Sequence, residues 1–128
     1  MSSYEEVVIK VLKKEKIKFI REKRFKDLKG GKYRFDFYLP EKNYCIEVHG
    51  EQHWRHIKHF HKTRNEFLSQ KERDRRKISY CLSHNIKLYI IPYWEIENLR
   101  RPSDIFQNKF LAKNRWHCDM LTENLTFK

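Results

Sequence analysis

The sequence predicts an α/β (α+β) fold in which a mixed central sheet is flanked by helices. Two runs, residues 33–39 (YRFDFYL) and 44–49 (YCIEVH), alternate or are rich in aromatic residues and are separated by a short turn, which is typical of a strand hairpin. A long amphipathic stretch then precedes a dense apolar run, residues 87–92 (KLYIIP), which suits a buried central strand. Because a helix between two strands implies a crossover connection, we expect part of the sheet to be parallel.

The elements around this hairpin follow from capping and periodicity. A capping box begins at Ser3, and apolar residues recur after it at helical spacing, which predicts a helix over about 3–15. A short extended segment follows, and the KGGK run at 29–32 predicts a turn. Apolar positions at helical spacing predict a second helix over 65–84.

The C-terminal part is the least patterned. We expect one helix at roughly 102–114 and a poorly defined tail after it. The 128 residues fit one domain, with a core at about 3–114 and a tail at about 115–128.

The composition indicates a folded, strongly basic chain. Aromatic residues make up 15% of it, which argues against disorder. Lys and Arg number 29 against 17 Asp and Glu, so the formal net charge is +12. A polyanion is the commonest partner of so basic a surface, because phosphate contacts release counterions; the alternative is a basic protein without such a partner.

The three cysteines, Cys45, Cys81 and Cys118, lie far apart and form no C-x-x-C pair. This spacing excludes a four-cysteine zinc site and does not favour a disulfide framework. The N-terminal stretch lacks the apolar segment of a signal peptide, and no apolar run reaches membrane-spanning length. We therefore expect a reducing, aqueous compartment, the cytoplasm, and no membrane partner.

Two carboxylates stand inside the predicted hairpin, Asp36 in its first strand and Glu47 in its second. A buried carboxylate without a partner costs several kcal/mol, so each needs a metal ion or a cation such as Arg34 or Lys18. Two converging carboxylates suit Mg²⁺, which activates water and neutralises charge in phosphodiester hydrolysis. The alternative is that one or both point outward from an edge strand.

A histidine and a charged helix face follow the second strand. His53 lies just past the strand end, where a general base is well placed, although it is one of four histidines between residues 53 and 61. Asp74 is one of only two acids in a basic run and could orient that histidine. Glu5, on the first helix, could reach the same pocket through a metal-bound water. The cations of this run form either a solvated face or a grip on DNA.

The runs 36–40 (DFYLP), 46–53 (IEVHGEQH), 73–77 (RDRRK) and 85–93 (NIKLYIIPY) resemble small phage-type homing endonucleases. These form the very-short-patch-repair-like branch of the PD-(D/E)XK superfamily, the EDxHD group. The resemblance covers residues 5–95 and implies a restriction-endonuclease-like core that cleaves DNA with Mg²⁺ or with Mn²⁺ in its place.

The resemblance also implies a role for each matching residue. Glu5, with Glu6 as an alternative, matches the helix glutamate, Asp36 the metal-binding aspartate and Glu47 the acid of the (D/E)-x-K element. His53 matches the motif histidine, supported by Asp74. The main-chain carbonyl of Val48 would help to hold the metal, and His49 and Gln52 are auxiliary residues.

Two departures from the family pattern bear on function. His49 replaces the usual lysine of the (D/E)-x-K element, which fits this branch but weakens a simple lysine mechanism. Glu51 stands where the repair enzymes have a zinc-binding cysteine, so we expect no structural zinc. The loss of that zinc favours a homing or free-standing nuclease over a mismatch-nicking repair endonuclease.

The leading hypothesis is therefore a metal-dependent DNA endonuclease, in the host cytoplasm if phage-encoded. A homodimer or a protein partner would supply specificity. The competing hypotheses are a non-catalytic nucleic-acid-binding module on the same fold and a protein-interaction domain. Trp54 or Phe60 could wedge against bases, although a core position is the more usual one. The expected DNA-backbone contacts are Arg55, Lys58, Lys62, Arg64, Lys71, Arg73, Arg75, Arg76 and Lys77.

Overall fold

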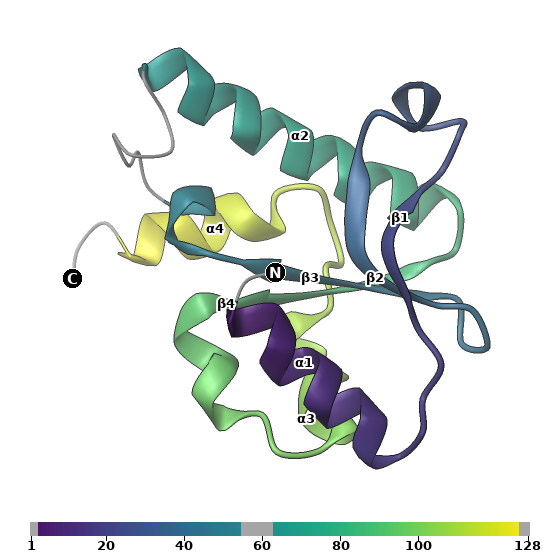
Figure 1. Cartoon of the computed structure of the whole chain (residues 1–128). Helices are drawn as coiled ribbons and strands as arrows, with labels where there is room; N and C mark the ends of the chain where they lie inside the picture. The colour runs from purple at the N-terminus through teal and green to yellow at the C-terminus, as the bar shows by residue number, and fades with distance from the viewer. Residues whose placement is uncertain (1–2, 55–62, 126–128) are drawn as a thin grey trace.

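The computed structural model describes residues 3–54 and 63–125, and it confirms a mixed sheet between helices (Figure 1). The strands are β1 (Ile20–Arg24), β2 (Arg34–Leu39), β3 (Tyr44–His49) and β4 (Lys87–Pro92), in the order β1-β2-β3-β4. The pairs β1–β2 and β2–β3 are antiparallel, and β3–β4 is parallel. The parallel pair exists because α2 (Arg64–Ser83) carries the chain across one face of the sheet between β3 and β4.

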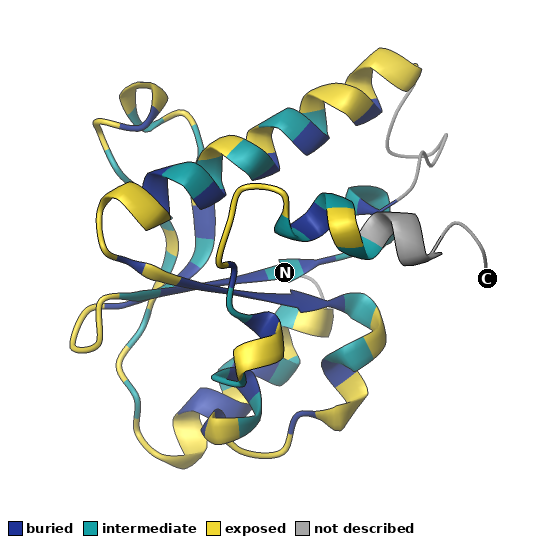
Figure 2. Ribbon diagram, turned by 180° about the vertical axis from the view of Figure 1, so that it is seen from behind, coloured by how far each residue is buried: buried dark blue, intermediate teal, exposed yellow. Residues whose placement is uncertain are grey.

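Helices cover both faces of this sheet (Figures 1 and 2). On one face, α1 (Ser3–Lys14) and α3 (Pro102–Ile105) pack over a cluster that includes Leu12, Phe37 and Ile91. On the other face, α2 and α4 (His117–Leu125) pack over a second cluster that includes Ile78 and Ile90. Successive strand residues point to opposite faces, so β3 sends Ile46 to the α1 side and Cys45 to the α2 side.

The long helix α2 has a clear N-terminal cap and a polar buried stripe. The Thr63 hydroxyl accepts a hydrogen bond from the Glu66 amide at 3.2 Å. Its buried residues, all but Tyr80, recur every three or four positions, as on one face of a helix, and two of the six are charged. They are Phe67, Lys71, Asp74, Ile78, Tyr80 and Cys81.

The prediction of a helix at 102–114 is wrong beyond Ile105. Helix α3 ends there, and a single 3-10 turn (Asn108–Phe110) follows. The chain then runs along the outer edge of β4, where Leu111 bridges Tyr89 and the Ala112 amide donates to the Leu88 carbonyl at 2.9 Å. This segment covers part of the outer edge of β4. Its backbone donors bond to that edge, so they are not available for the hydrogen bonds of a helix.

The prediction of a poorly defined tail after about residue 114 is also wrong for residues 117–125. Residues 117–125 form α4, which packs against α2 and buries Cys118. Asp119 accepts two hydrogen bonds from the Arg75 guanidinium, at 2.9 and 3.0 Å. The C-terminal residues therefore complete the layer above the candidate site.

Candidate active site

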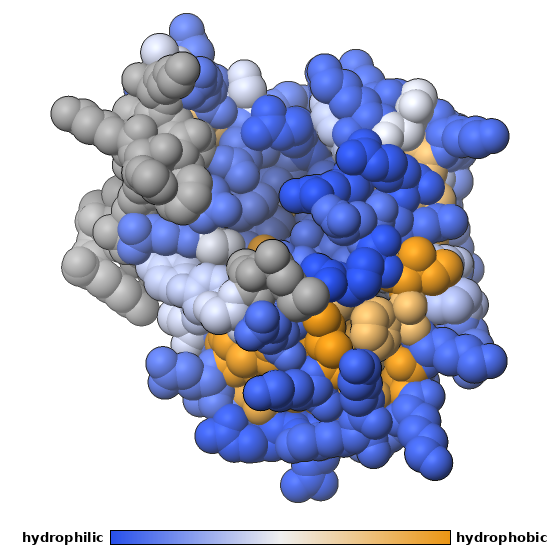
Figure 3. All heavy atoms as spheres, viewed as in Figure 1, coloured by the Kyte–Doolittle hydropathy of each residue, from blue (hydrophilic) through white to orange (hydrophobic). Residues whose placement is uncertain are grey.

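A cavity of about 540 Å³ lies between the start of α1, the adjoining parts of β2 and β3, and α2. In Figure 3, hydrophilic side chains surround the hollow in the upper part of this face. The cavity brings together most of the site residues that the sequence predicts, from four separate parts of the chain. They are Glu5, Asp36, Glu47, Val48, Gln52, His53, Arg73, Asp74 and Lys77.

The two predicted carboxylates meet where β2 and β3 separate. The ladder between these strands runs from Leu39–Tyr44 to Phe37–Ile46 and stops there. Beyond it, the Asp36 amide donates to the Glu47 carboxylate at 3.1 Å, and the Val48 amide donates to the Asp36 carboxylate at 2.8 Å. Side chains thus replace the next ladder bonds, so both carboxylates sit in a fixed fork beside the backbone of Val48.

Burial and mutual repulsion act on this pair of acids. Burial, followed by the charge of Glu47, raises the pKa of Asp36 to about 8. Burial also opposes ionisation of Glu47, but the Lys77 ammonium outweighs it, so the pKa of Glu47 stays below its usual range. The fork therefore holds Glu47 as a carboxylate, whereas Asp36 has no ion pair of its own in the part of the chain that the structure describes.

Lys77 lies in the acidic fork and not on the exposed face of α2. We predicted a DNA-backbone contact, but its ammonium forms an ion pair with Glu47, and only 13% of its side chain is exposed. Burial works against its charge, yet the Glu47 carboxylate raises the pKa of Lys77 above its ordinary value. A lysine from α2 thus occupies the acidic fork.

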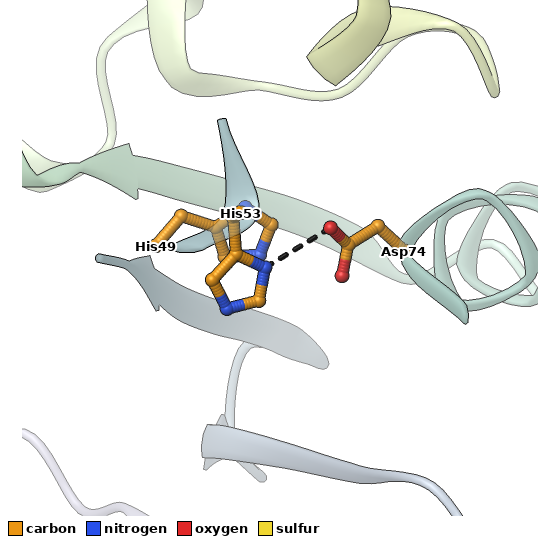
Figure 4. A group of neighbouring side chains, drawn as sticks. All are labelled: His49, His53 and Asp74. Atoms are coloured by element: carbon orange, nitrogen blue, oxygen red, sulfur yellow. Dashed lines mark hydrogen bonds and ion pairs between the residues drawn. The ribbon is translucent and has the colours of Figure 1, made fainter. Parts of the chain in front are cut away.

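His53 and Asp74 form a hydrogen-bonded pair beside the fork (Figure 4). The His53 Nδ1 and Asp74 Oδ2 atoms are 3.0 Å apart. Interaction with the histidines outweighs burial and keeps the pKa of Asp74 low, so the carboxylate accepts and Nδ1–H donates. The second ring nitrogen of His53, Nε2, lies 3.3 Å from the Gln70 amide nitrogen. Sequence analysis did not identify Gln70.

His49 lies behind His53 as a buried support. Its ring stacks on that of His53 with centroids 3.8 Å apart and an angle of 12° between planes (Figure 4). Burial and the nearby His53 lower the pKa of His49, so its ring is neutral. Its Nδ1 lies 3.8 Å from the Cys118 sulfur, and its main-chain carbonyl accepts from the Trp54 indole at 3.2 Å. Trp54 is buried and belongs to the core, so it is not a wedge.

Donor atoms of His49, His53 and Asp74 lie within 4.8 Å of one another, close enough by distance alone to share a metal ion. The stacked rings argue against it. A zinc ion binds near the imidazole plane, at about 2.0–2.1 Å from nitrogen. An ion midway between the rings would lie half of 3.8 Å, about 1.9 Å, from each plane. One ring would have to turn, so this group fits a proton-transfer pair better than a metal site.

Glu5 reaches the cavity from the first turn of α1. Its carboxylate accepts from the Arg21 guanidinium at 2.6 Å, and Arg21 packs over the Phe37 ring. Sequence analysis did not identify Arg21, which fixes the orientation of Glu5. Glu6 is exposed and does not line the cavity, so Glu5 is the helix glutamate that faces the site.

Two further predicted DNA contacts point into the protein. Lys71 is 5% exposed, and its ammonium donates to the His53 carbonyl at 3.3 Å and lies 3.7 Å from Asp119. Arg75 forms the two hydrogen bonds to Asp119 that tie α2 to α4. The prediction for Lys71 is wrong, because its side chain is buried, whereas the DNA contact of Arg75, whose side chain is 26% exposed, stays a prediction. Arg64, Arg73 and Arg76 are exposed, and Arg55, Lys58, Lys62 and Phe60 lie outside the described residues.

The basic partners that we considered for the carboxylates have other contacts. Arg34 pairs with Glu22, and Lys18 lies 3.6 Å from Glu41. Glu51 and Gln52 form the 3-10 turn that carries the chain from β3 to His53. None of the three cysteines is in a disulfide. The absence of a structural zinc remains a prediction.

No family model matches this chain. A search of curated proteins finds an uncharacterized protein, 307L, of Invertebrate iridescent virus 6, which is 36% identical over 67 residues. This match covers 51% of the chain but 34% of the relative, so the chain spans about a third of that protein's length. Among the described residues, no helix is both long and apolar enough to cross a membrane.

Proposed function

We propose that this chain is a metal-dependent DNA endonuclease that hydrolyses phosphodiester bonds, built on a PD-(D/E)XK core. The observation that carries the proposal is the fork of Asp36 and Glu47, which opens into the same cavity as the His53–Asp74 pair. A hard-oxygen site and a histidine with an oriented lone pair are the two parts that phosphodiester hydrolysis needs.

The donor set fits Mg²⁺ or Mn²⁺. The oxygens come from Asp36 and Glu47, with the main-chain carbonyl of Val48 at the same strand end. Asp36 is partly buried and has no ion pair among the described residues, and burial together with the charge of Glu47 raises its pKa. A divalent cation bound by these groups would neutralise charge on the scissile phosphate and lower the pKa of water.

The chain's own residues supply proton transfer and orientation. His53 Nε2 takes a proton from the attacking water as the new P–O bond forms, and Asp74 stabilises the resulting imidazolium. The opposite P–O bond breaks, and the departing oxygen takes its proton from solvent. Lys77 keeps Glu47 ionised, and Arg21 holds Glu5 at the cavity wall.

The net charge of +12 and the exposed Arg73 and Arg76 support DNA as substrate. We propose that the chain is a homing or free-standing nuclease that acts in the cytoplasm. We also propose that a second copy of the chain or a protein partner supplies sequence specificity, because the described residues form a single layered domain around one site.

One observation favours a non-catalytic DNA-binding module as the second candidate. The ion pair with Lys77 already neutralises Glu47 without a metal ion. A fork stabilised in this way could persist in a protein that binds DNA and does not cut it.

Cleavage of supercoiled plasmid separates the two candidates. The wild type, Asp36→Asn and Glu41→Gln are incubated with Mg²⁺, with Mn²⁺ or with EDTA. Glu41 is a matched control, because it is an exposed acid at the far end of the hairpin. We expect the wild type and Glu41→Gln to cut only with metal, and Asp36→Asn to bind but not cut. If all three proteins bind DNA and none of them cuts it, the endonuclease proposal fails and the non-catalytic binding module takes its place.

A further inference from the structure

The cations of α2 divide into an inner and an outer set. Lys71, Arg75 and Lys77 turn inward and contact acids of the protein. Arg73 and Arg76 are exposed on the side of the helix that faces the turn between β1 and β2. Arg64 is exposed as well but lies at the start of α2, so Arg73 and Arg76 form the outer set beside the cavity, and the direction they face determines where a polyanion would lie.

A second hollow of about 330 Å³ adjoins the candidate active site along this outer set. It shares Lys32, Tyr33 and Arg73 with the wall of the main cavity. Its remaining lining residues are Ser69, Glu72 and Arg76. The shared residues make the two hollows neighbours between α2 and the loop before β2.

Positive charge dominates this second hollow. Among the residues that the structure describes, neither Lys32 nor Arg73 has an acidic partner. The single acid, Glu72, already accepts from Arg75 and Arg76, and Arg115 lies 3.7 Å from it. Arg76 also donates weakly to the Tyr33 hydroxyl at 3.5 Å. The charges of Lys32 and Arg73 therefore face solvent and form no ion pair with the described residues.

The loop that carries Lys32 is held in place. Gly30 and Gly31 have φ of 63° and 82°, which favours glycine, and so they form the tight turn before Lys32. The Arg24 guanidinium donates to the carbonyls of Gly31 and Lys32 at 2.8 and 2.9 Å. Lys32 is thus presented from an ordered support opposite Arg73.

We propose that Lys32, Arg73 and Arg76 form a second anion subsite, which binds the backbone phosphate next to the scissile one. The DNA strand then leaves the active site on this side, between α2 and the turn before β2. Tyr33 lies between the two hollows and offers its ring to the base of that nucleotide. The inference rests on the proposed function for the identity of the neighbouring scissile phosphate.

Salt-dependent binding tests this subsite without any cleavage. Affinity for a labelled DNA duplex is measured by fluorescence anisotropy in EDTA at several salt concentrations. The double variant Lys32→Gln/Arg73→Gln is compared with Lys10→Gln/Lys13→Gln, which removes the same charge from exposed positions on α1, the helix that covers the other face. Circular dichroism checks that both variants keep their helices.

We expect the first variant to bind more weakly and its salt slope to fall by about 0.9, the change that corresponds to one lost phosphate contact. The α1 variant should keep the wild-type slope. Equal slopes in the two variants, or no DNA binding by the wild type, would overturn the subsite. Plasmid cleavage with equal slopes refutes the subsite alone, and a reduced slope without any cleavage refutes the nuclease proposal alone.

Discussion

The buried ion pair between Lys77 and Glu47 should dominate the response of the fold to substitution. Only 13% of the Lys77 side chain and 5% of the Glu47 side chain are exposed, and Asp36 is adjacent. The change Lys77→Met keeps the volume and removes the charge. It leaves Glu47 buried without a counter-charge, which costs about 3–5 kcal/mol when a buried pair loses one partner.

The double variant Lys77→Met/Glu47→Gln removes both charges. Because no buried charge is then left alone, we expect it to regain most of that loss, so that the two single effects are strongly non-additive. Urea unfolding followed by circular dichroism, on the wild type, both single variants and the double variant, gives the coupling free energy.

Mg²⁺ supplies an internal control for the same cycle. A cation at the fork provides the charge that Lys77→Met removes, so the single variant should gain more stability from Mg²⁺ than the wild type does. Additive single effects, or a loss below about 1 kcal/mol in Lys77→Met, would show that the pair is not buried as described and would refute the reasoning.

Three further predictions concern Asp36 and Asp74 at the site and Asp119 on α4. Burial raises the pKa of Asp36 to about 8, so the folded chain keeps a proton that the unfolded chain loses, and stability falls as pH rises from about 4 through about 8. Asp36→Asn should therefore become more stable than the wild type as pH rises, in metal-free urea titrations, and a constant difference between pH 5 and 9 would contradict this. Asp74→Asn should lower plasmid cleavage by about 100-fold or more with the helical content unchanged, because the amide no longer fixes the His53 tautomer; near wild-type rates would remove the pair from the mechanism. Asp119→Asn should cost about 1 kcal/mol in urea unfolding, because it weakens the bonds from Arg75, whereas Glu41→Gln should cost nothing measurable.

The strands and the two long helices were predictable because their patterns are local. Alternation in β2, the dense apolar run of β4, the capping box of α1 and the apolar spacing of α2 set these elements to within about a residue. The segment after Ile105 was not predictable, because its conformation depends on the edge of β4, a partner far away in the sequence. Helix α4 is short and packs on α2 through an ion pair, which local periodicity does not reveal.

The acids and histidines of the site were predictable because a carboxylate inside an apolar strand is unusual. The sorting of the cations on α2 was missed, although a signal was present. Lys71, Asp74, Ile78 and Cys81 recur every three or four positions, which places the first two on the buried stripe. Lys77 adjoins that stripe one position before Ile78. We interpreted the run by its composition, as a basic face, and not by its helical phase.

Whether the fork of Asp36 and Glu47 holds a metal ion is tested by Mn²⁺ binding, followed by electron paramagnetic resonance as free Mn²⁺ is titrated. We expect a saturable site in the wild type and in Glu41→Gln that is lost in Asp36→Asn and in Glu47→Gln, with Mg²⁺ competing for it. Equal Mn²⁺ binding by all four proteins, or none by the wild type, would contradict a metal site at the fork of β2 and β3.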